Sequence, residues 1–469
     1  MNSDKKSSLK HIAELISQIK NLEEENLRLQ QQVEQVTGEL EKYKNLASKY
    51  KIEQKDVAPP KQRAKNILKF KLATVLYADA QGYGKINTEM DSNLLVDSLD
   101  EMFLQLESII NKYEIKRLRT LGDTIMCVGG IPQKNMTNPI EVVLAAIEMQ
   151  YYVRDLQRAY GNDRIWDIRF GAHTGPVTAI MSGRKKIQYE VKGESVNLAT
   201  RIRSFCEPGG ILISEDTYEL VKDLFVCEYA SRMPVKYKGD IELFYVRGIK
   251  SEYSLQKKGI IPNKRFSVRF GLIQFTDLQE LMLNKLEREL PSYLFYHNVK
   301  HTIDVVTQAE LIGIGEDVND EELLLLKTAA LFHDAGHILS YDDHEHFSTL
   351  IVREILPDYF YTQRQIDIIC ELIMTTKLPP VPKNKLERIM CDADLDYLGR
   401  SDMIPVSNSL YRELKEMDKI GTMRAWNKLQ LKFISNHQYF TKTAQSLREV
   451  NKQKQIERIK NLIEADDAE

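Results

Sequence analysis

The sequence lacks the features that mark membrane-spanning and secreted proteins. No stretch of its 469 residues approaches the ~18 to 20 uninterrupted apolar residues that a transmembrane helix needs. The first residues, MNSDKKSSLK, have no apolar core of a signal peptide, and the five cysteines include no CxxC pair. We therefore expect a soluble protein of the reducing cytoplasm, with no membrane partner.

The sequence also lacks an excess of charge of either sign. Its 65 basic and 68 acidic residues give a formal net charge of −3. Such a chain has no global field to hold nucleic acid, so we expect no nucleic-acid partner and only local phosphate binding. At ~150 residues per domain, the length predicts two or three domains.

Changes in the sequence pattern predict the domain boundaries. Heptads come first, then alternating strand and helix patterns, and then long helical patterns with charged faces. The predicted parts are a dimeric coiled coil (8–55), a linker (56–66), an α+β domain (67–250), a second linker (251–274), an all-helical domain (275–440) and a charged helix (441–469).

The heptad repeat runs without a break from Ile12 to Tyr50. Leu predominates at one core position and β-branched residues recur at the other, which favours a parallel two-stranded coiled coil. Asn26 falls at a buried position, where an Asn fixes register and dimer state at some cost in stability. A single solvated helix is the alternative. We expect a homodimer.

The middle domain has a strand and helix order typical of a ferredoxin-like α+β layer. KFKLATVLYADA is predicted as a buried strand, DSNLLVDSLDEMFLQLESIINKY as a helix, and EIKRLRTLGDTIMCVGG as two strands about a tight turn. A helix from Pro139 to Tyr160 and the strand DIRFGAHTGPVTAI follow. The order βαββαβ predicts antiparallel pairing at the hairpin.

Two aspartates of this domain are candidate metal ligands. Asp79 ends an apolar strand and Asp123 lies in the hairpin turn, so the sheet should bring their carboxylates side by side. Oxygen ligands of this kind suit Mg²⁺ or Mn²⁺ bridging to phosphates. Gly82 belongs to a glycine-containing turn that opens the next helix and predicts a triphosphate cradle. An ordinary helix cap is the alternative.

Four ordered motifs in this domain resemble the class III nucleotidyl cyclase catalytic domain. They are VLYADAQGYG, LRTLGDTIMCVGGIP, IRFGAHTGPVTAIMSGRKKIQYEVKGESVNLATRI and VKYKGD. The resemblance implies that Asp79 and Asp123 bind two Mg²⁺ or Mn²⁺ ions that act on a nucleoside triphosphate. It also implies a phosphate-binding lysine at Lys236, with Lys238 as the alternative.

The same resemblance implies that Asn197 and Arg201 stabilise the transition state. The two residues are at i and i+4, so their side chains share one face of a helix. In this family the aspartates and the Asn/Arg pair come from different chains, which implies an active homodimer with two equivalent sites. A cyclase fold kept for binding alone is the alternative.

Base selection departs from the usual family pattern. Arg119 stands where adenylyl cyclases usually have Lys, and Glu190 where they have Asp or Thr. Because Glu190 can accept from an exocyclic amino group and Arg119 can donate to a ring nitrogen, the pair favours ATP, and cyclic AMP as product. GTP or a pyrimidine triphosphate remains open.

The helical domain concentrates histidines and aspartates in a pattern typical of a metal site. Six of the nine histidines fall between residues 297 and 346. Side chains of both types on several helices of one bundle make a mixed nitrogen and oxygen site, suited to Zn²⁺, Mn²⁺ or Fe²⁺. The candidates are His297, His301, His333, Asp334, His337, His344, Asp392 and Asp394.

The motifs YHNVKH, LFHDAGH, HEHFS and DADLDYLG resemble the HD phosphohydrolase superfamily. The resemblance implies that the metal ligands are His301, His333, Asp334 and Asp394, with Asp392 as a less favoured substitute for Asp394. His297 matches a histidine that protonates the leaving oxygen in cyclic-nucleotide phosphodiesterases. His337 and His344 could complete a second metal site bridged by Asp334. A metal- or nucleotide-binding sensor without turnover is the alternative.

Overall fold

The computed structural model describes residues 67–81, 92–121, 124–159, 167–182, 188–235 and 239–468. The chain divides into two units, 1–64 and 65–469, and all described residues belong to the second unit. The predicted coiled coil, 8–55, and the linker, 56–66, lie outside the described residues. Among the described helices, none is long and apolar enough to cross a membrane.

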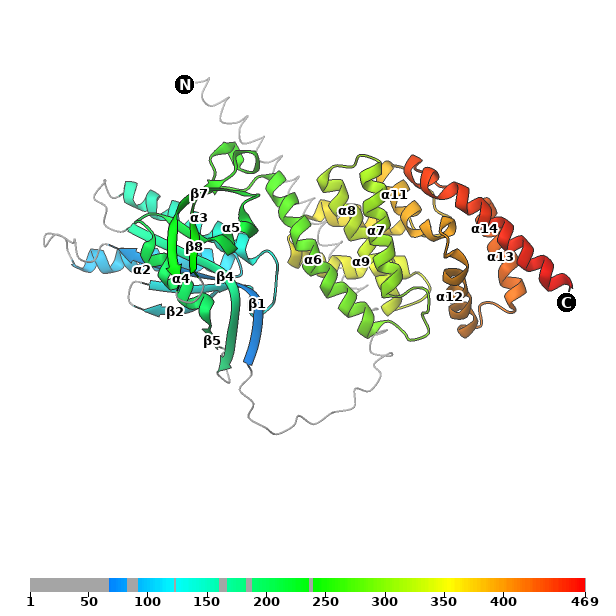
Figure 1. The fold of residues 1–469 in the computed structure, drawn as a ribbon, viewed down its shortest axis with the longest axis horizontal. Helices are drawn as coiled ribbons and strands as arrows, with labels where there is room; N and C mark the ends of the chain where they lie inside the picture. Colours follow the sequence, from blue (N-terminus) through cyan, green and yellow to red (C-terminus); the bar gives the residue numbers. More distant parts are fainter. Residues whose placement is uncertain are drawn as a thin grey trace, which may run out of the picture. The chain divides into compact units, whose positions relative to one another are not determined.

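The described strands of the first domain form one sheet (Figure 1). They are β1 (Ile67–Gln81), β2 (Lys116–Leu121), β3 (Thr124–Gly129), β4 (Asp167–Ser182), β5 (Gln188–Lys192), β6 (Ile211–Ser214), β7 (Phe225–Val235) and β8 (Gly239–Ile249). Their order is β2-β3-β1-β4-β6-β8-β7, and β5 pairs with β4. The helices between them are α2 (Ser92–Lys112), α3 (Asn138–Ala159), α4 (Glu194–Phe205) and α5 (Glu215–Val221).

The predicted order βαββαβ is found from β1 to β4. Strand β1 is apolar on both faces because Leu76, Ala78 and Ala80 enter one hydrophobic core, while Ala73 and Val75 enter another. The domain extends beyond that prediction with β5 to β8, α4 and α5.

Strand pairing places Asp79, near the end of β1, between two neighbours. In the antiparallel register, Asp79 lies opposite Thr124 of β3 and opposite Arg169 of β4. Thr124 directly follows the predicted hairpin turn. This end of the central strand is therefore the place where the sheet can bring polar side chains together.

The described chain after β8 is helical, as predicted for the part from residue 275 on. Two short helices, η2 (Ser251–Tyr253) and η3 (Leu255–Lys257), precede the α-helices. These are α6 (Lys264–Glu289), α7 (Val299–Gly315), α8 (Asp320–Phe332), α9 (His344–Ile355), α10 (Gln363–Met374), α11 (Lys385–Asp394), α12 (Met403–Glu416), α13 (Met423–Asn436) and α14 (Lys442–Ala468). The connecting 3-10 helices are η4 (Ala335–Ile338), η5 (Leu356–Tyr359) and η6 (Asp396–Gly399).

Helix α6 begins inside the segment predicted as a linker, 251–274. Asn263 caps it by accepting a hydrogen bond from the backbone N–H of Phe266. Helix α7 begins in the same way, since Asn298 accepts from the backbone N–H groups of Lys300 and His301. That cap fixes the first turn of the helix that carries a predicted metal ligand.

Candidate functional sites

The first candidate site surrounds the buried carboxylate of Asp79, which is 4% exposed. Its Oδ2 accepts a hydrogen bond of 2.7 Å from Nε of Arg169, and its Oδ1 accepts one of 2.8 Å from the Thr124 hydroxyl. The Arg203 Nη1 lies 3.6 Å from Oδ1. Burial acts to raise the pKa of Asp79, but these partners outweigh it and lower the pKa, so the carboxylate is ionised.

The predicted transition-state pair lies on α4, away from this carboxylate. Asn197 and Arg201 are both exposed, and Arg201 donates a hydrogen bond of 2.6 Å to the backbone oxygen of Pro234 in β7. Arg203, on the same helix, faces Asp79 instead. Two residues along a helix turn the side chain by about 200°, so Arg201 and Arg203 leave α4 on opposite sides.

Of the remaining predicted residues of this domain, two lie in described strands and the others lie outside the described residues. Glu190 is exposed on β5 and forms a 3.0 Å ion pair with Lys192. The side chain of Arg119, on β2, is not among those described. The positions outside the described residues are Gly82, Asp123, Lys236 and Lys238.

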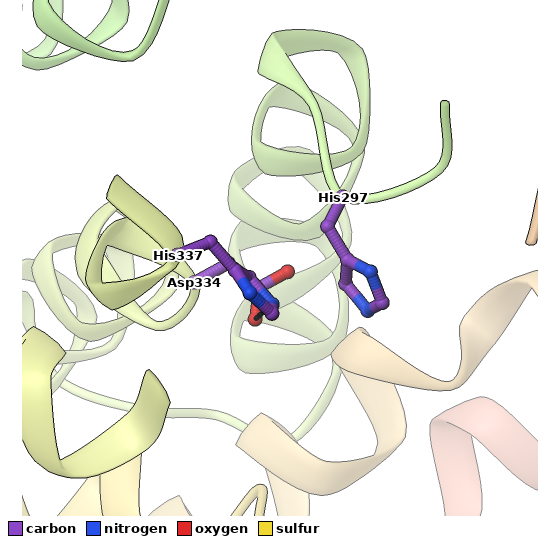
Figure 2. Close-up of side chains that lie close together, drawn as sticks. All are labelled: His297, Asp334 and His337. Atoms are coloured by element: carbon purple, nitrogen blue, oxygen red, sulfur yellow. Dashed lines mark ion pairs between the residues drawn. The ribbon is translucent and has the colours of Figure 1, made fainter. Parts of the chain in front are cut away.

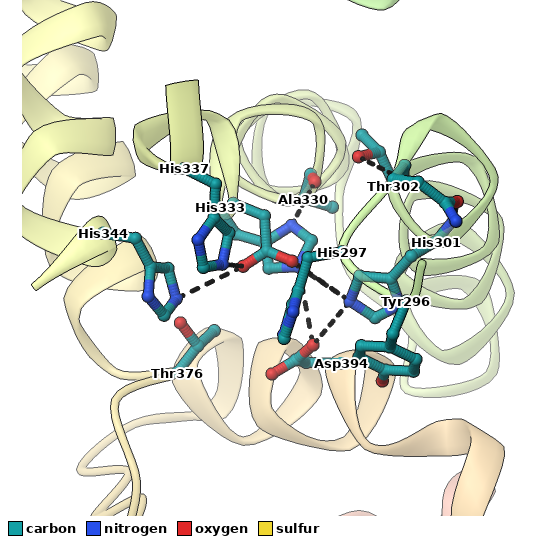
Figure 3. Close-up of polar contacts among 12 residues, drawn as sticks. Tyr296, His297, His301, Thr302, Ala330, His333, His337, His344, Thr376 and Asp394 are labelled. Atoms are coloured by element: carbon teal, nitrogen blue, oxygen red, sulfur yellow. Dashed lines mark hydrogen bonds and ion pairs between the residues drawn. The ribbon is translucent and has the colours of Figure 1, made fainter. Parts of the chain in front are cut away.

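The second candidate site lies in the helical domain, where seven predicted side chains converge (Figure 3 labels all of them except Asp334). They come from the turn before α7, from α7 itself, from the junction of α8 with η4, from η4, from the start of α9 and from the end of α11. In that order they are His297, His301, His333 with Asp334, His337, His344 and Asp394.

One set of donor atoms has the spacing of a single metal site. Nε2 of His301 lies 3.3 Å from Oδ2 of Asp334 and 3.3 Å from Oδ1 of Asp394. Nε2 of His333 lies 3.2 Å and 3.5 Å from the same oxygens, and 3.3 Å from Nε2 of His301. Atoms at such separations can all bind one ion at ~2.1 Å, the usual length of Zn–N and Zn–O bonds.

A second set lies on the other side of the Asp334 carboxylate (Figure 2). Oδ1 of Asp334 lies 3.4 Å from Nε2 of His344 and 4.0 Å from Nε2 of His337. The ring of His297 lies against that of His337, with 4.6 Å between the ring centroids. Asp334 therefore offers one oxygen to each set, as a carboxylate that bridges two metal ions does.

Buried atoms of the cluster lack hydrogen-bond partners. Neither ring nitrogen of His337 has such a partner among the described residues. Burying polar atoms in this way costs free energy unless a ligand satisfies them. The Nδ1–H of His333, in contrast, points to the backbone oxygen of Ala330 at 2.8 Å, which leaves Nε2 to bind metal. The residues fit divalent metal ions.

The charges of the carboxylates and histidines in the cluster depend on one another. Burial alone would raise the pKa of Asp334 and Asp394, yet the neighbouring histidines lower both, so both carboxylates are ionised. Burial acts to lower the pKa of His301, His333 and His344, but the carboxylates outweigh it and raise the pKa of all three rings. Burial lowers the pKa of His337 to about 2, which leaves that ring neutral. Because metal binds the neutral imidazole, a metal ion at these carboxylates would replace protons on the histidines.

Glu413 of α12 is a functional residue that the sequence analysis missed. It is fully buried, and its Oε1 lies 2.5 Å from Nδ1 of His297. Its Oε2 accepts hydrogen bonds of 2.9 Å and 3.1 Å from the backbone N–H groups of Tyr296 and His297. A carboxylate in this position orients the imidazole. The 116 residues between Glu413 and His297 exclude any signal from local spacing.

Asp392, the substitute that was considered for Asp394, has a structural role. Its carboxylate accepts hydrogen bonds from the backbone N–H groups of Phe440 and Thr441 and from the Thr441 hydroxyl, at 2.7–3.2 Å. These contacts tie α11 to the segment before α14. Asp394, at the end of the same helix, faces the histidines.

A cavity of about 600 Å³ opens beside the metal cluster. Cluster residues, including His297, Asp334 and Asp394, line part of it, and α12 and α13 supply an apolar wall. That wall comprises Leu410, Leu414, Trp426, Leu429 and Phe433. Ligand pockets commonly have roughly 300 to 1,000 Å³ and apolar walls with a few polar groups.

Comparison with known proteins agrees with this division into two sites. Residues 65–248 match the family described as the adenylate and guanylate cyclase catalytic domain, and residues 298–396 match the HD domain family. A protein named adenylate cyclase from Mycobacterium bovis is 29% identical over 192 residues, which are 40% of this chain and 43% of that protein. The receptor-type guanylate cyclase gcy-8 of Caenorhabditis elegans is 30% identical over 189 residues, 39% of this chain and 16% of that protein.

The chain thus spans less than half the length of these two curated relatives. Among solved structures, the adenylyl cyclase CyaB from P. aeruginosa is 28% identical, with a TM-score of 0.35, and the match covers 38% of this chain and 95% of that one. The guanylate cyclase domain of RhGC from Catenaria anguillulae, in complex with GTP, is 26% identical with the same TM-score, over 39% and 100%. The chain carries a class III adenylate/guanylate cyclase catalytic domain followed by an HD domain.

Proposed function

We propose that the chain is a nucleotidyl cyclase whose active sites form between two copies, with ATP as the preferred substrate. The observation that carries the shared site is the geometry of α4. Within one chain, Asp79 contacts Arg203, whereas Arg201 leaves the helix on the opposite side and contacts Pro234. A second copy, related by a two-fold axis, can supply Arg201 to Asp79 and receive the same in return.

The residues divide the chemistry of cyclisation between them. Divalent metal held by Asp79, with Asp123, supplies charge neutralisation and activation of the ribose hydroxyl. Asn197 orients the ribose, and Arg201 neutralises charge that develops on the transferring phosphate, a role that suits its fixed guanidinium. Lys236 binds the outer phosphates. The product is a 3′,5′-cyclic nucleotide, with diphosphate as the leaving group.

The preference for ATP rests on two neighbouring strands. Arg119 lies on β2 and Glu190 on β5, and these strands contact each other. A donor and an acceptor at such positions can pair with the ring nitrogen and the amino group of adenine. GTP, or a pyrimidine triphosphate, is the alternative substrate.

Complementation tests the shared site. Asp79→Ala and Arg201→Ala are each expected to be nearly inactive as homodimers. Their mixture should regain cyclase activity, because a heterodimer keeps one site with both residues intact. The matched control is a mixture of Asp79→Ala with Asp79→Ala/Arg201→Ala, which contains no intact site. An inactive first mixture, with heterodimers shown to form, would refute the shared site.

We further propose that the HD domain is a phosphohydrolase that cleaves a cyclic nucleotide. The observation that carries it is the bridging position of Asp334 between two sets of donor atoms. Divalent metal ions supply there a Lewis acid that activates water and neutralises the phosphate. His297, oriented by Glu413, protonates the leaving oxygen.

The cavity wall favours a substrate with a flat base. Leu410, Trp426 and Phe433 provide apolar surface, and Gln430 is a polar group among them. The Gln430 Oε1 accepts from the Ser407 hydroxyl, which in turn accepts from the Trp426 indole N–H at 3.1 Å. This chain of hydrogen bonds orients the carboxamide, so that its NH₂ group is available to a base edge.

Hydrolysis assays on the Mn²⁺-loaded protein test this second proposal. Wild type is expected to cleave cyclic AMP or cyclic GMP to the 5′-monophosphate, and His297→Ala should keep its metal but turn over ~10² to 10⁴ times more slowly. The exposed His346→Ala serves as the control. A metal-loaded wild type that cleaves neither nucleotide, nor bis(p-nitrophenyl) phosphate, would leave the HD domain as a sensor.

A further inference from the structure

A cation from the protein itself contacts the metal-binding carboxylate of the cyclase site. Arg203 Nη1 lies 3.6 Å from Oδ1 of Asp79 and donates a hydrogen bond of 3.0 Å to the Thr124 hydroxyl. Thr124 donates its own proton to the same Oδ1. Arg203 thus lies next to one carboxylate oxygen of Asp79, Oδ1, whereas Arg169 is bound to the other oxygen, Oδ2.

The backbone holds Arg203 in this place. A Cβ atom added to Gly171 of β4 would lie only 2.3 Å from the backbone N and 2.5 Å from the Cα of Arg203. The absence of a side chain at Gly171 therefore lets this turn of α4 pack directly against the strand. Gly171 pairs with Tyr77 of β1, and the Arg203 guanidinium lies 5.7 Å from the centre of the Tyr77 ring. The Arg203 side chain is 20% exposed. Its approach to Asp79 is therefore built into the packing of helix on sheet.

We propose that Arg203 is a positioning residue that takes the place of a divalent metal at Asp79, and that metal must displace it. The inference rests on the proposed cyclase function only in assigning metal to Asp79. An ionised carboxylate that is 4% exposed needs a compensating charge, and Arg169 and Arg203 provide it. A divalent ion at Oδ1 competes with Arg203 for the same oxygen.

The consequence reaches beyond one site. Arg203 and Arg201 leave α4 on opposite sides, so the helix that contacts Asp79 of its own chain also presents Arg201 to the partner. Release of Arg203 by metal removes a contact that holds this helix to the sheet. Metal entry at one site is thereby linked to the position of the transition-state residue in the other.

Binding of Mn²⁺ alone to the full-length dimer, followed by electron paramagnetic resonance, tests the proposal without turnover. The bound Mn²⁺ that is lost in Asp79→Ala is assigned to the cyclase site, because this substitution leaves the HD sites unchanged. Arg203→Gln should bind Mn²⁺ at the cyclase site roughly tenfold more tightly than wild type. An opposite charge within ~4 to 6 Å of a carboxylate changes the pKa of that carboxylate by about one unit or more, and we expect an effect of similar size on its affinity for a metal ion. Arg158→Gln, which removes an exposed arginine paired with Asp155 on α3, is the control and should bind Mn²⁺ at the cyclase site as wild type does.

Thermal unfolding gives the second readout. In EDTA, Arg203→Gln should unfold at a lower temperature than wild type, and saturating Mn²⁺ should close this difference. Arg203→Lys, which keeps the charge but lacks the fork that reaches Thr124, should show smaller shifts of the same sign and covers the case in which the Gln variant fails to fold. Mn²⁺ affinity that is unchanged or weaker in the variant that folds would overturn the proposal.

The outcomes separate this inference from the proposed function. If no nucleotide is cyclised but Arg203→Gln binds Mn²⁺ more tightly, the cyclase proposal fails and the role of Arg203 stands. If cyclic product forms and Mn²⁺ affinity does not change, Arg203 has no such role and the cyclase proposal stands.

Discussion

Glu413→Gln should impair the HD site without removing its metal. The carboxylate contacts Nδ1 of His297 at 2.5 Å, and it contacts none of the proposed metal ligands among the described residues. Glutamine has nearly the same shape and can still accept from the two backbone N–H groups. It loses the negative charge of the group that contacts the His297 ring.

The magnitude follows from that one lost interaction. A hydrogen bond to a charged group contributes about 1.5 to 3 kcal/mol, so about 2 kcal/mol should be lost, which corresponds to a ~30-fold fall in kcat. KM should change little, because Glu413 lies behind His297 rather than in the cavity wall. Burial acts to raise the pKa of Glu413, but His297 and the backbone N–H groups lower it, so the wild-type group is ionised.

The assay is hydrolysis of bis(p-nitrophenyl) phosphate and of cyclic AMP across a range of pH, with metal content measured in parallel. Glu416→Gln is the matched control, since Glu416 lies on the same helix but is exposed. We expect Glu416→Gln to behave as wild type. A Glu413→Gln protein with the wild-type kcat would refute the orienting role, and one that has lost its metal would show that Glu413 supports the cluster instead.

Three other perturbations separate the parts of the chain. Asp334→Ala should remove metal from the HD domain, as measured by elemental analysis, while cyclase activity persists; a dead cyclase would contradict separate sites. Glu190→Ala should lower the kcat/KM ratio for ATP over GTP with a smaller fall in turnover, because the phosphates are held elsewhere, and an unchanged ratio would contradict base recognition by Glu190. Deletion of residues 1–56 should lower cyclase activity more in dilute than in concentrated protein, since a coiled coil raises the effective concentration of two catalytic domains. Equal specific activity at all dilutions would remove that role.

Local patterns predicted the elements that carry the sites. The apolar run before Asp79 forms β1, and His301 lies in the capped first turn of α7. His297, expected one turn earlier on the same helix, lies just before the Asn298 cap and outside the helix. Strand and helix periodicity and capping residues are local properties, which explains why β1 to β4 and the helical region follow the prediction.

Contacts between distant segments were not predictable in the same way. The pairing of Glu413 with His297 and of Arg203 with Asp79 depends on how elements pack, and neither pair has a characteristic spacing. The beginning of α6 at Lys264 was also missed, because its Asn cap follows Gly259 and Pro262, which are turn-forming residues typical of a linker. Packing decides such features.

A time course of the full-length protein with ATP and Mn²⁺ tests most directly the claim that one chain both makes and hydrolyses a cyclic nucleotide. Chromatography of the nucleotides should show cyclic AMP rising first and 5′-AMP following at its expense. In Asp334→Ala, cyclic AMP should accumulate without 5′-AMP. Formation of 5′-AMP in Asp334→Ala at the wild-type rate, or no cyclic nucleotide from any of the four nucleoside triphosphates in the wild type, would contradict the account.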